Sequence, residues 1–388
     1  MTKIIAYFRS KPVAWLLLFI PIAIVAEVGQ FTPIWVFAFS ALAVVPLAGY
    51  IGESTEALAH YTGPRLGGLL NATLGNAAEL IITIVAIRAG LLELVKASIT
   101  GSILGNLLLV LGMAMLIGGI RHGRQIFDRR QASHNAVLLV MTVLTLMVPS
   151  LFSHYIGTGL DTDPKVEALS LGVAAVMILL YGLGVFYSFK GESPVMVEES
   201  GHILEDSALC KKTALPENET TVVPHPTETP PVWTLRTALL VLSLSTVGVA
   251  YMSELLVGAV EPVVEAVGLS EFFIGIIFIP IIGNVAEHLV AVQVAMRNKM
   301  TLSVEIAVAS SLQVALFVAP VLVFVSLLLG HPLTLIFNQF ELLALIAGVL
   351  IAALVSADGE SNWLEGAELL AIYVILALAF FLLPMPRG

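Results

Sequence analysis

The stretch Asn71-Ala-Thr-Leu-Gly-Asn-Ala-Ala-Glu79 returns in altered form as Ile279-Pro-Ile-Ile-Gly-Asn-Val-Ala-Glu-His288. Both copies place a Gly-Asn-x-x-Glu pattern in the middle of a long apolar run. A carboxylate inside an apolar membrane segment is costly, so such a residue is a candidate for function. A single acid of this kind can also be a buried structural group that a neighbouring helix satisfies. A repeated pair favours a functional site.

The composition places the chain among helical membrane proteins. It has 388 residues, of which 58% are hydrophobic and 12% are charged. Several apolar stretches reach the length of about twenty residues that crosses a bilayer as a helix. The formal net charge of -10 argues against a nucleic-acid partner. The single cysteine, Cys210, excludes an internal disulfide framework and a thiol cluster for zinc.

The apolar stretches predict an all-α polytopic membrane protein with about 11 transmembrane helices. A leading helix falls within residues 1–31, after Lys3, Arg9 and Lys11, which place the N-terminus in the cytoplasm. The other spans are predicted near residues 34–59, 66–90, 94–119, 133–153, 166–188, 234–259, 269–295, 302–329, 333–355 and 363–384. No transit peptide is apparent, which favours the plasma (inner) membrane of a prokaryote.

The spans fall into two sets of five that enter the membrane in opposite senses. The sets cover residues 32–190 and 232–388, and a segment rich in Glu, Asp, Thr and Pro joins them at residues 191–231. That composition predicts a flexible linker. Because five is odd and the linker stays on the cytoplasmic side, the second set is inverted relative to the first. The C-terminus is then expected on the opposite side of the membrane.

Three polar motifs recur in the same order in the two sets, which favours an internal duplication. The first pair is Gly52-Glu-Ser-Thr-Glu56 and Ala250-Tyr-Met-Ser-Glu254, the second is Gly75-Asn-Ala-Ala-Glu79 and Gly283-Asn-Val-Ala-Glu287, and the third is Gly101-Ser-Ile-Leu-Gly-Asn106 and Ala309-Ser-Ser-Leu-Gln313. Inverted repeats of this kind build a midplane binding site at the repeat interface of secondary transporters.

The second motif also predicts a break in each helix that carries it. Gly75 and Gly283 weaken a helix interior, and Pro280 precedes the second glycine. Broken helices would leave backbone carbonyls facing a cavity. In both copies the glutamate is the third residue after the asparagine, so the amide and the carboxylate share one helix face.

The candidate metal ligands are the amide, carboxylate and hydroxyl side chains of the second and third motifs. They are Asn76, Glu79, Ser102, Asn106, Asn284, Glu287, Ser310 and Gln313. An all-oxygen site with two carboxylates suits a hard cation, and Ca²⁺ accepts a larger and more flexible ligand shell than Mg²⁺. The same donors do not exclude Mn²⁺ or Cd²⁺ as the bound cation.

These motifs resemble those of the calcium/proton exchangers of the cation/calcium exchanger superfamily. The resemblance rests on the two Gly-Asn-x-x-Glu motifs with the serine motifs downstream, and the hydropathy layout covers essentially the whole chain. Sodium/calcium exchangers typically carry Ser-Ala-Pro-Glu in the first repeat and an aspartate in the second, so the resemblance implies protons as the coupling ion. It also implies that Glu56 and Glu254, on gate helices, transfer the ion into or out of the binding site. Alternatively, these two acids simply face water.

His288 is a second candidate for the proton path, because the usual pKa of histidine lies near neutrality. Adjacent residues point to different faces of a helix, so a structural hydrogen bond is the alternative role for this side chain.

The resulting hypothesis is a secondary antiporter that exchanges Ca²⁺ for H⁺ and catalyses no covalent chemistry. Ca²⁺ is then the transported substrate, and no cofactor is expected. The expected partners are Ca²⁺, H⁺ and the lipid bilayer. A homo-oligomer is a further possibility that the sequence does not decide. The alternatives are a cation channel or an antiporter for another cation such as Mn²⁺ or Na⁺. An intramembrane hydrolase lacks a supporting Gly-x-Ser-x-Gly or His-Glu-x-x-His pattern.

Shortening the linker between Gly191 and Pro231 should leave transport possible, because its composition builds no core and the candidate ligands lie elsewhere. The check is ⁴⁵Ca²⁺ uptake by membrane vesicles that carry the deletion. Complete loss of uptake in a correctly inserted variant would contradict the prediction.

Overall fold

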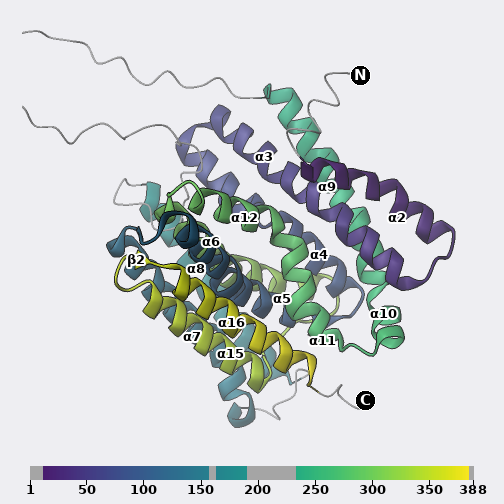
Figure 1. Ribbon diagram of the computed structural model, residues 1–388. Helices are drawn as coiled ribbons and strands as arrows, with labels where there is room; N and C mark the ends of the chain where they lie inside the picture. The colour runs from purple at the N-terminus through teal and green to yellow at the C-terminus, as the bar shows by residue number, and fades with distance from the viewer. Residues whose placement is uncertain (1–11, 157–162, 190–232, 384–388) are drawn as a thin grey trace, which may run out of the picture.

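The computed structural model describes residues 12–156, 163–189 and 233–383, and these are almost entirely helical (Figure 1). The predicted linker at residues 191–231 lies outside the described residues. Eight helical stretches are long and apolar enough to cross a membrane, and 13–28 and 339–355 form shorter apolar helices, within the part of the chain that is described. The all-α membrane fold is therefore confirmed. The count of eleven spans stays a prediction.

The first half of the chain contains η1 (Pro12–Leu18), α2 (Phe19–Val28), α3 (Pro33–Leu74), α4 (Ala77–Arg88), α5 (Leu92–Leu104), η2 (Gly105–Val110), α6 (Leu111–His122), β1 (Gln125–Ile126), α7 (Arg129–Ile156) and α8 (Pro164–Phe189). The second half contains α9 (Leu235–Gly258), α10 (Val260–Val267), α11 (Glu271–Phe273), η3 (Ile274–Phe278), α12 (Ile279–Ala295), α13 (Met300–Gln313), η4 (Val314–Val318), α14 (Ala319–Leu328), α15 (Gln339–Val355), β2 (Glu360–Ser361) and α16 (Trp363–Phe381).

The predicted span at residues 66–90 is divided between two helices. A non-helical Gly63, with φ of 81°, kinks α3, and the chain then continues as helix to Leu74. Gly75 and Asn76 form the turn before α4, so the predicted break at Gly75 is confirmed.

The predicted break at Gly283 is wrong, because α12 runs through this glycine without interruption. The irregular backbone lies earlier, in the π-helical turn η3. Pro280 directly follows this turn, within one continuous helical stretch over residues 271–295. The missing N–H of the proline is therefore accommodated beside the π-helical turn, and the helix continues past it.

The predicted span at residues 333–355 starts too early, because residues 331–338 are not helical. Backbone amides at 333, 335 and 337 donate instead to the hydroxyls of Ser326, Ser170 and Ser150, at 2.8, 3.1 and 2.9 Å. Asn338 and Glu341 then form a capping box that begins α15. Serines from neighbouring helices thus satisfy backbone groups that would otherwise be unpaired in an apolar interior.

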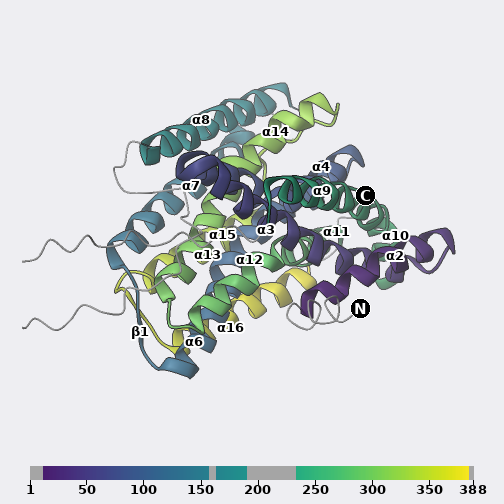
Figure 2. The ribbon, with the colours of Figure 1, turned by 90° about the horizontal axis from the view of Figure 1, so that it is seen from above.

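The two halves of the chain interleave rather than sit apart (Figures 1 and 2). Helix α9 packs along α3 and against α4, and α12 packs against α3, α4 and α5. Around this centre, α16 packs on α6, α15 on α7 and α14 on α8. The two short strands β1 and β2, which were not predicted, pair antiparallel and tie the first half to the second.

Helices α5 and η3 approach each other closely through a glycine on each side. A Cβ atom added to Gly101 would overlap the carbonyl oxygen of Ile276, and one added to Gly275 would lie 2.8 Å from the Cβ of Ala97. Gly101 is thus a point of close packing between the two helices. The approach brings the polar residues of α5 beside the start of α12.

Substitution of Gly101 by alanine should destabilise the protein by about 1–3 kcal/mol, because the added methyl meets backbone that cannot move aside. The matched control is Gly105→Ala, since a Cβ at Gly105 meets nothing within 4 Å. Thermal unfolding of the detergent-solubilised variants compares the two. Equal melting temperatures for Gly101→Ala and the control would contradict this packing.

Candidate cation site

The eight predicted ligands meet in the interior, where α4, α12, α13 and the α5–η2 segment converge. Seven of their side chains are buried: Asn76, Glu79, Ser102, Asn106, Asn284, Ser310 and Gln313. The remaining one, Glu287, is half-buried. The site therefore combines residues from both halves of the chain and is more open beside Glu287 than beside Glu79.

Each carboxylate is held by a serine of its own half. The hydroxyl of Ser102 donates to Oε1 of Glu79, and that of Ser310 donates to Oε2 of Glu287 at 2.7 Å. Both pairs are separated by 23 residues, so the two halves build the same local arrangement. Charge-assisted hydrogen bonds of this type fix the orientation of a carboxylate.

Amide side chains connect the two halves. Nδ2 of Asn284 donates to Ser102 Oγ at 3.3 Å, and Nδ2 of Asn106 donates to Ser310 Oγ at 3.0 Å. A third bond joins Nδ2 of Asn76 to Oε1 of Gln313 at 2.7 Å. Every one of these bonds crosses between the repeats, so the serines and the carboxylates they hold belong to one shared site.

The glycines of the second motif lie beside the acids of the opposite repeat. A Cβ on Gly75 would lie 3.4 Å from Oε1 of Glu287, and a Cβ on Gly283 would lie 3.6 Å from the Cβ of Glu79. The contacts are reciprocal, because each glycine faces the glutamate of the other half. Both distances are ordinary van der Waals contacts, so a Cβ at Gly283 would fit beside Glu79.

Two oxygen atoms of the site are buried without a hydrogen-bond partner in the described structure, Oδ1 of Asn76 and Oε2 of Glu79. Buried polar atoms are normally satisfied, so such atoms call for an explanation. Both are carboxylate or amide oxygens, the donors that Ca²⁺ prefers. With the carboxylate of Glu287 and the two serine hydroxyls nearby, the donor set fits a hard divalent cation.

His288 belongs to the same network but not to the acid pair. Its Nε2 lies 3.2 Å from Oδ1 of Asn106, which in turn bonds to Ser310. The side chain is buried. His288 therefore makes a structural hydrogen bond, which was the alternative to a role in the proton path. Asn106 and Ser310 also connect it to Glu287.

Glu56 and Glu254 do not join the site, because both side chains are exposed. Glu254 instead forms an ion pair with Arg88 at 3.1 Å, at the end of α4. The sequence analysis did not single out Arg88. An arginine follows the motif glutamate at a similar spacing in both halves, since Arg88 lies nine residues after Glu79 and Arg297 lies ten residues after Glu287.

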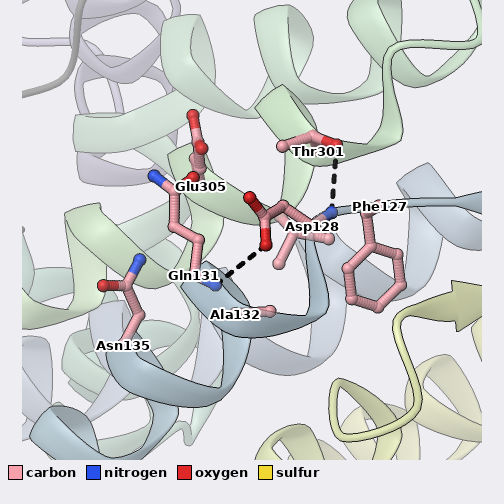
Figure 3. Close-up of a pocket in the computed structure, with 8 residues that line it drawn as sticks. Phe127, Asp128, Gln131, Ala132, Asn135, Thr301 and Glu305 are labelled. Atoms are coloured by element: carbon pink, nitrogen blue, oxygen red, sulfur yellow. Dashed lines mark hydrogen bonds between the residues drawn. The ribbon is translucent and has the colours of Figure 1, made fainter. Parts of the chain in front are cut away.

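A hollow at the starts of α7 and α13 contains none of the predicted ligands (Figure 3). Its lining residues are Phe127, Asp128, Gln131, Ala132, Asn135, Thr301, Val304 and Glu305. Asp128 accepts from the backbone amides of Arg130 and Gln131, at 2.9 and 3.1 Å, and so caps α7. Two helix N-termini meet here, and their positive ends disfavour a cation. Asp128 therefore has a structural role as the cap of α7.

The fold defines a helical membrane protein whose two halves meet at a buried cluster of acids, amides and hydroxyls, and comparison with known proteins gives its family. A family model described as sodium/calcium exchanger protein matches residues 32–190 and 237–382. The chain belongs to this family, within the cation/calcium exchanger superfamily.

Three relatives show how far the similarity extends. A Ca²⁺/H⁺ antiporter of Aphanothece halophytica is 45% identical over 95% of this chain and 96% of its own length. The Ca²⁺/H⁺ antiporter ChaA of Bacillus subtilis is 40% identical over 94% of this chain and 97% of its own. The solved structure of native YfkE matches with a TM-score of 0.78 and 38% identity, covering 96% of this chain and 100% of that one.

Proposed function

We propose that the protein is a secondary antiporter that exchanges Ca²⁺ for H⁺ across a membrane. The observation that carries this proposal is the convergence of Glu79 and Glu287 in one buried all-oxygen network that includes unpartnered oxygens. The names of relatives at 40–45% identity over nearly the whole chain support it. These relatives are transporters, in keeping with a protein that performs no covalent chemistry.

The mechanism follows from the cost of leaving two bare carboxylates in an apolar interior. Protons neutralise the pair when no metal is bound, whereas bound Ca²⁺ stabilises the ionised forms. Calcium and protons therefore compete for the same oxygens. Alternation between the two sides is favourable only when the site is filled by one or the other, and this condition couples the two fluxes.

The proposed ligands are the eight side chains of the shared site. Glu79 and Glu287 supply the charge, Asn76 and Gln313 supply amide oxygens, and the serines orient the acids. The amides of Asn106 and Asn284 join the two halves across the site. Glu56, Glu254 and His288 are proposed for the gate and the proton path, as residues that act before or after the ion reaches the site.

The orientation and the division of the chain are further parts of the proposal. The leading segment 1–31 precedes one five-helix repeat at 32–190 and a second at 232–388, with the acidic linker 191–231 between them. The basic residues before the first span support a cytoplasmic N-terminus and linker, with the C-terminus on the other side. Bacterial relatives favour the plasma membrane.

A cation channel is the alternative that transport measurements distinguish most directly. A channel needs a continuous water-filled path through the membrane. Here Asn76 and Asn284 are buried and bonded across the repeats, and Glu79 is buried beside them, so the site is packed with side chains rather than lined by a continuous path. This arrangement favours a carrier that opens to one side at a time.

Replacing either acid, as Glu79→Gln or Glu287→Gln, should abolish exchange, because a desolvated divalent site with two carboxylates loses half of its charge. The measurement is ⁴⁵Ca²⁺ uptake into reconstituted vesicles with and without a pH gradient. Wild-type uptake should require the gradient, whereas a channel would pass calcium without it. The matched control is Glu261→Gln, which removes an exposed acid of α10.

Exchange by Glu79→Gln or Glu287→Gln at the wild-type rate, with comparable protein in the vesicles, would remove that residue from the site. Uptake by the wild type that ignores the pH gradient would contradict the antiport itself.

A further inference from the structure

Two turns from opposite halves of the chain are bonded into one surface. Residues 121–130 connect α6 to α7, and residues 295–301 connect α12 to α13. Nε2 of His122 lies 2.8 Å from the carbonyl oxygen of Met296, and Nε2 of Gln125 donates to two acceptors of the second turn at 3.0 Å. We call these two stretches together the basic platform.

The basic platform lies on the face of the molecule where α8 ends and α9 begins, which we call the linker face. Helix α7 leaves the platform and α8 returns, and both are long enough to cross a membrane. The end of α8 at Phe189 is therefore on the same face as the platform, which contains β1 beside the end of α6 (Figure 2). The platform thus meets the leaflet on the linker face.

The basic platform is rich in positive charge that no acid of the described chain neutralises. It contains six lysine and arginine residues against one acid, Asp128. The six are Arg121, Arg124, Arg129, Arg130, Arg297 and Lys299. Arg124 pairs with Glu360, whereas the other five form no ion pair within the described residues. Lys299 is half-buried and the arginines are exposed. Such a surface favours an anionic partner.

The inverted repeat shows that the fold does not require these charges. The equivalent turns of the opposite face are residues 88–92, between α4 and α5, and residues 329–338, between α14 and α15. They contain a single lysine or arginine, Arg88, which is paired with Glu254. A signal for membrane orientation needs only basic residues in the sequence. It does not need two turns from different halves joined by hydrogen bonds.

Large apolar side chains are exposed directly beside the charges. Ile120 and Ile126, which precede Arg121 and follow Gln125, are 70% and 75% exposed. Trp363 is also exposed and lies beside the end of α6, because a Cβ on Gly119 would overlap its backbone nitrogen. Cationic, apolar and tryptophan side chains meet in this way where lipid headgroups adjoin acyl chains. A soluble anion would engage the charges but gain nothing from the isoleucines.

We propose that the basic platform binds the phosphate groups of anionic phospholipids in the leaflet on the linker face. Arg121 and Arg297 adjoin the bonded residues His122 and Met296, so their side chains start from neighbouring points. Together they bind one phosphate. The bound lipid bridges the two halves at the end of α12, the helix that carries Glu287. This binding does not depend on which ions the protein exchanges.

The test titrates the detergent-solubilised full-length protein with phosphatidylglycerol or phosphatidylcholine and measures bound lipid by native mass spectrometry. The wild type should bind the anionic lipid more tightly. Arg121→Gln and Arg297→Gln should each weaken phosphatidylglycerol binding about fivefold, and the double variant about 25-fold. Phosphatidylcholine binding should stay unchanged, which shows that the variants are folded. The matched control is Arg236→Gln, an exposed arginine of α9 on the linker face but outside the platform.

Losses in both arginine variants, with the control unchanged, would support the lipid site. Equal affinity for the two lipids, no loss in the double variant, or an equal loss in Arg236→Gln would overturn it. Two other outcomes would overturn it by assigning the platform to another anion. Displacement of phosphatidylglycerol by inorganic phosphate at equal concentration would indicate a soluble anion. Binding that begins only after deletion of residues 191–231 would indicate the acidic linker.

Discussion

Two carboxylates that share one apolar interior are the constraint on which the rest of the site depends. Within the described chain, no ion pair involves Glu79 or Glu287, so neutralisation has to come from a bound ion. Each surrounding contact makes this possible. The serines orient the acids, and the cross-repeat amides hold the serines.

The repeated sequence explains both the symmetry of the site and its departure from symmetry. Equivalent serine–glutamate pairs show that the two halves supply the same chemistry. The helix of the first motif is broken at Gly75, whereas α12 continues through Gly283. The exposure of the two acids also differs, because Glu79 is buried and Glu287 is half-buried.

Much of the fold was predictable because membrane burial requires long apolar helices. The paired acids were predictable for the same reason, since charged residues stand out against such a background. The sequence was less informative about backbone irregularity. The π-helical turns η2, η3 and η4 are as apolar as the helices around them. The non-helical residues 331–338 did carry signals, in Pro332 and in the capping box of Asn338 and Glu341, and serine hydroxyls from other helices satisfy their backbone amides.

Pairing between side chains was also beyond the sequence. Arg88 and Glu254 were both visible in the sequence, but their pairing depends on which helices become neighbours. The same holds for the bond between Asn76 and Gln313, which are 237 residues apart. Sequence patterns therefore identified the polar groups of the site, and tertiary packing decided how they are connected.

The central claim is that calcium and protons compete for the same two carboxylates. The most direct test is a series of calcium-uptake curves at several pH values on the calcium-loading side, with the pH gradient held constant. Protonation of the pair as a coupled unit should raise the half-saturating Ca²⁺ concentration as the pH on that side falls. A half-saturating concentration that does not change with pH would show that the two ions do not share Glu79 and Glu287.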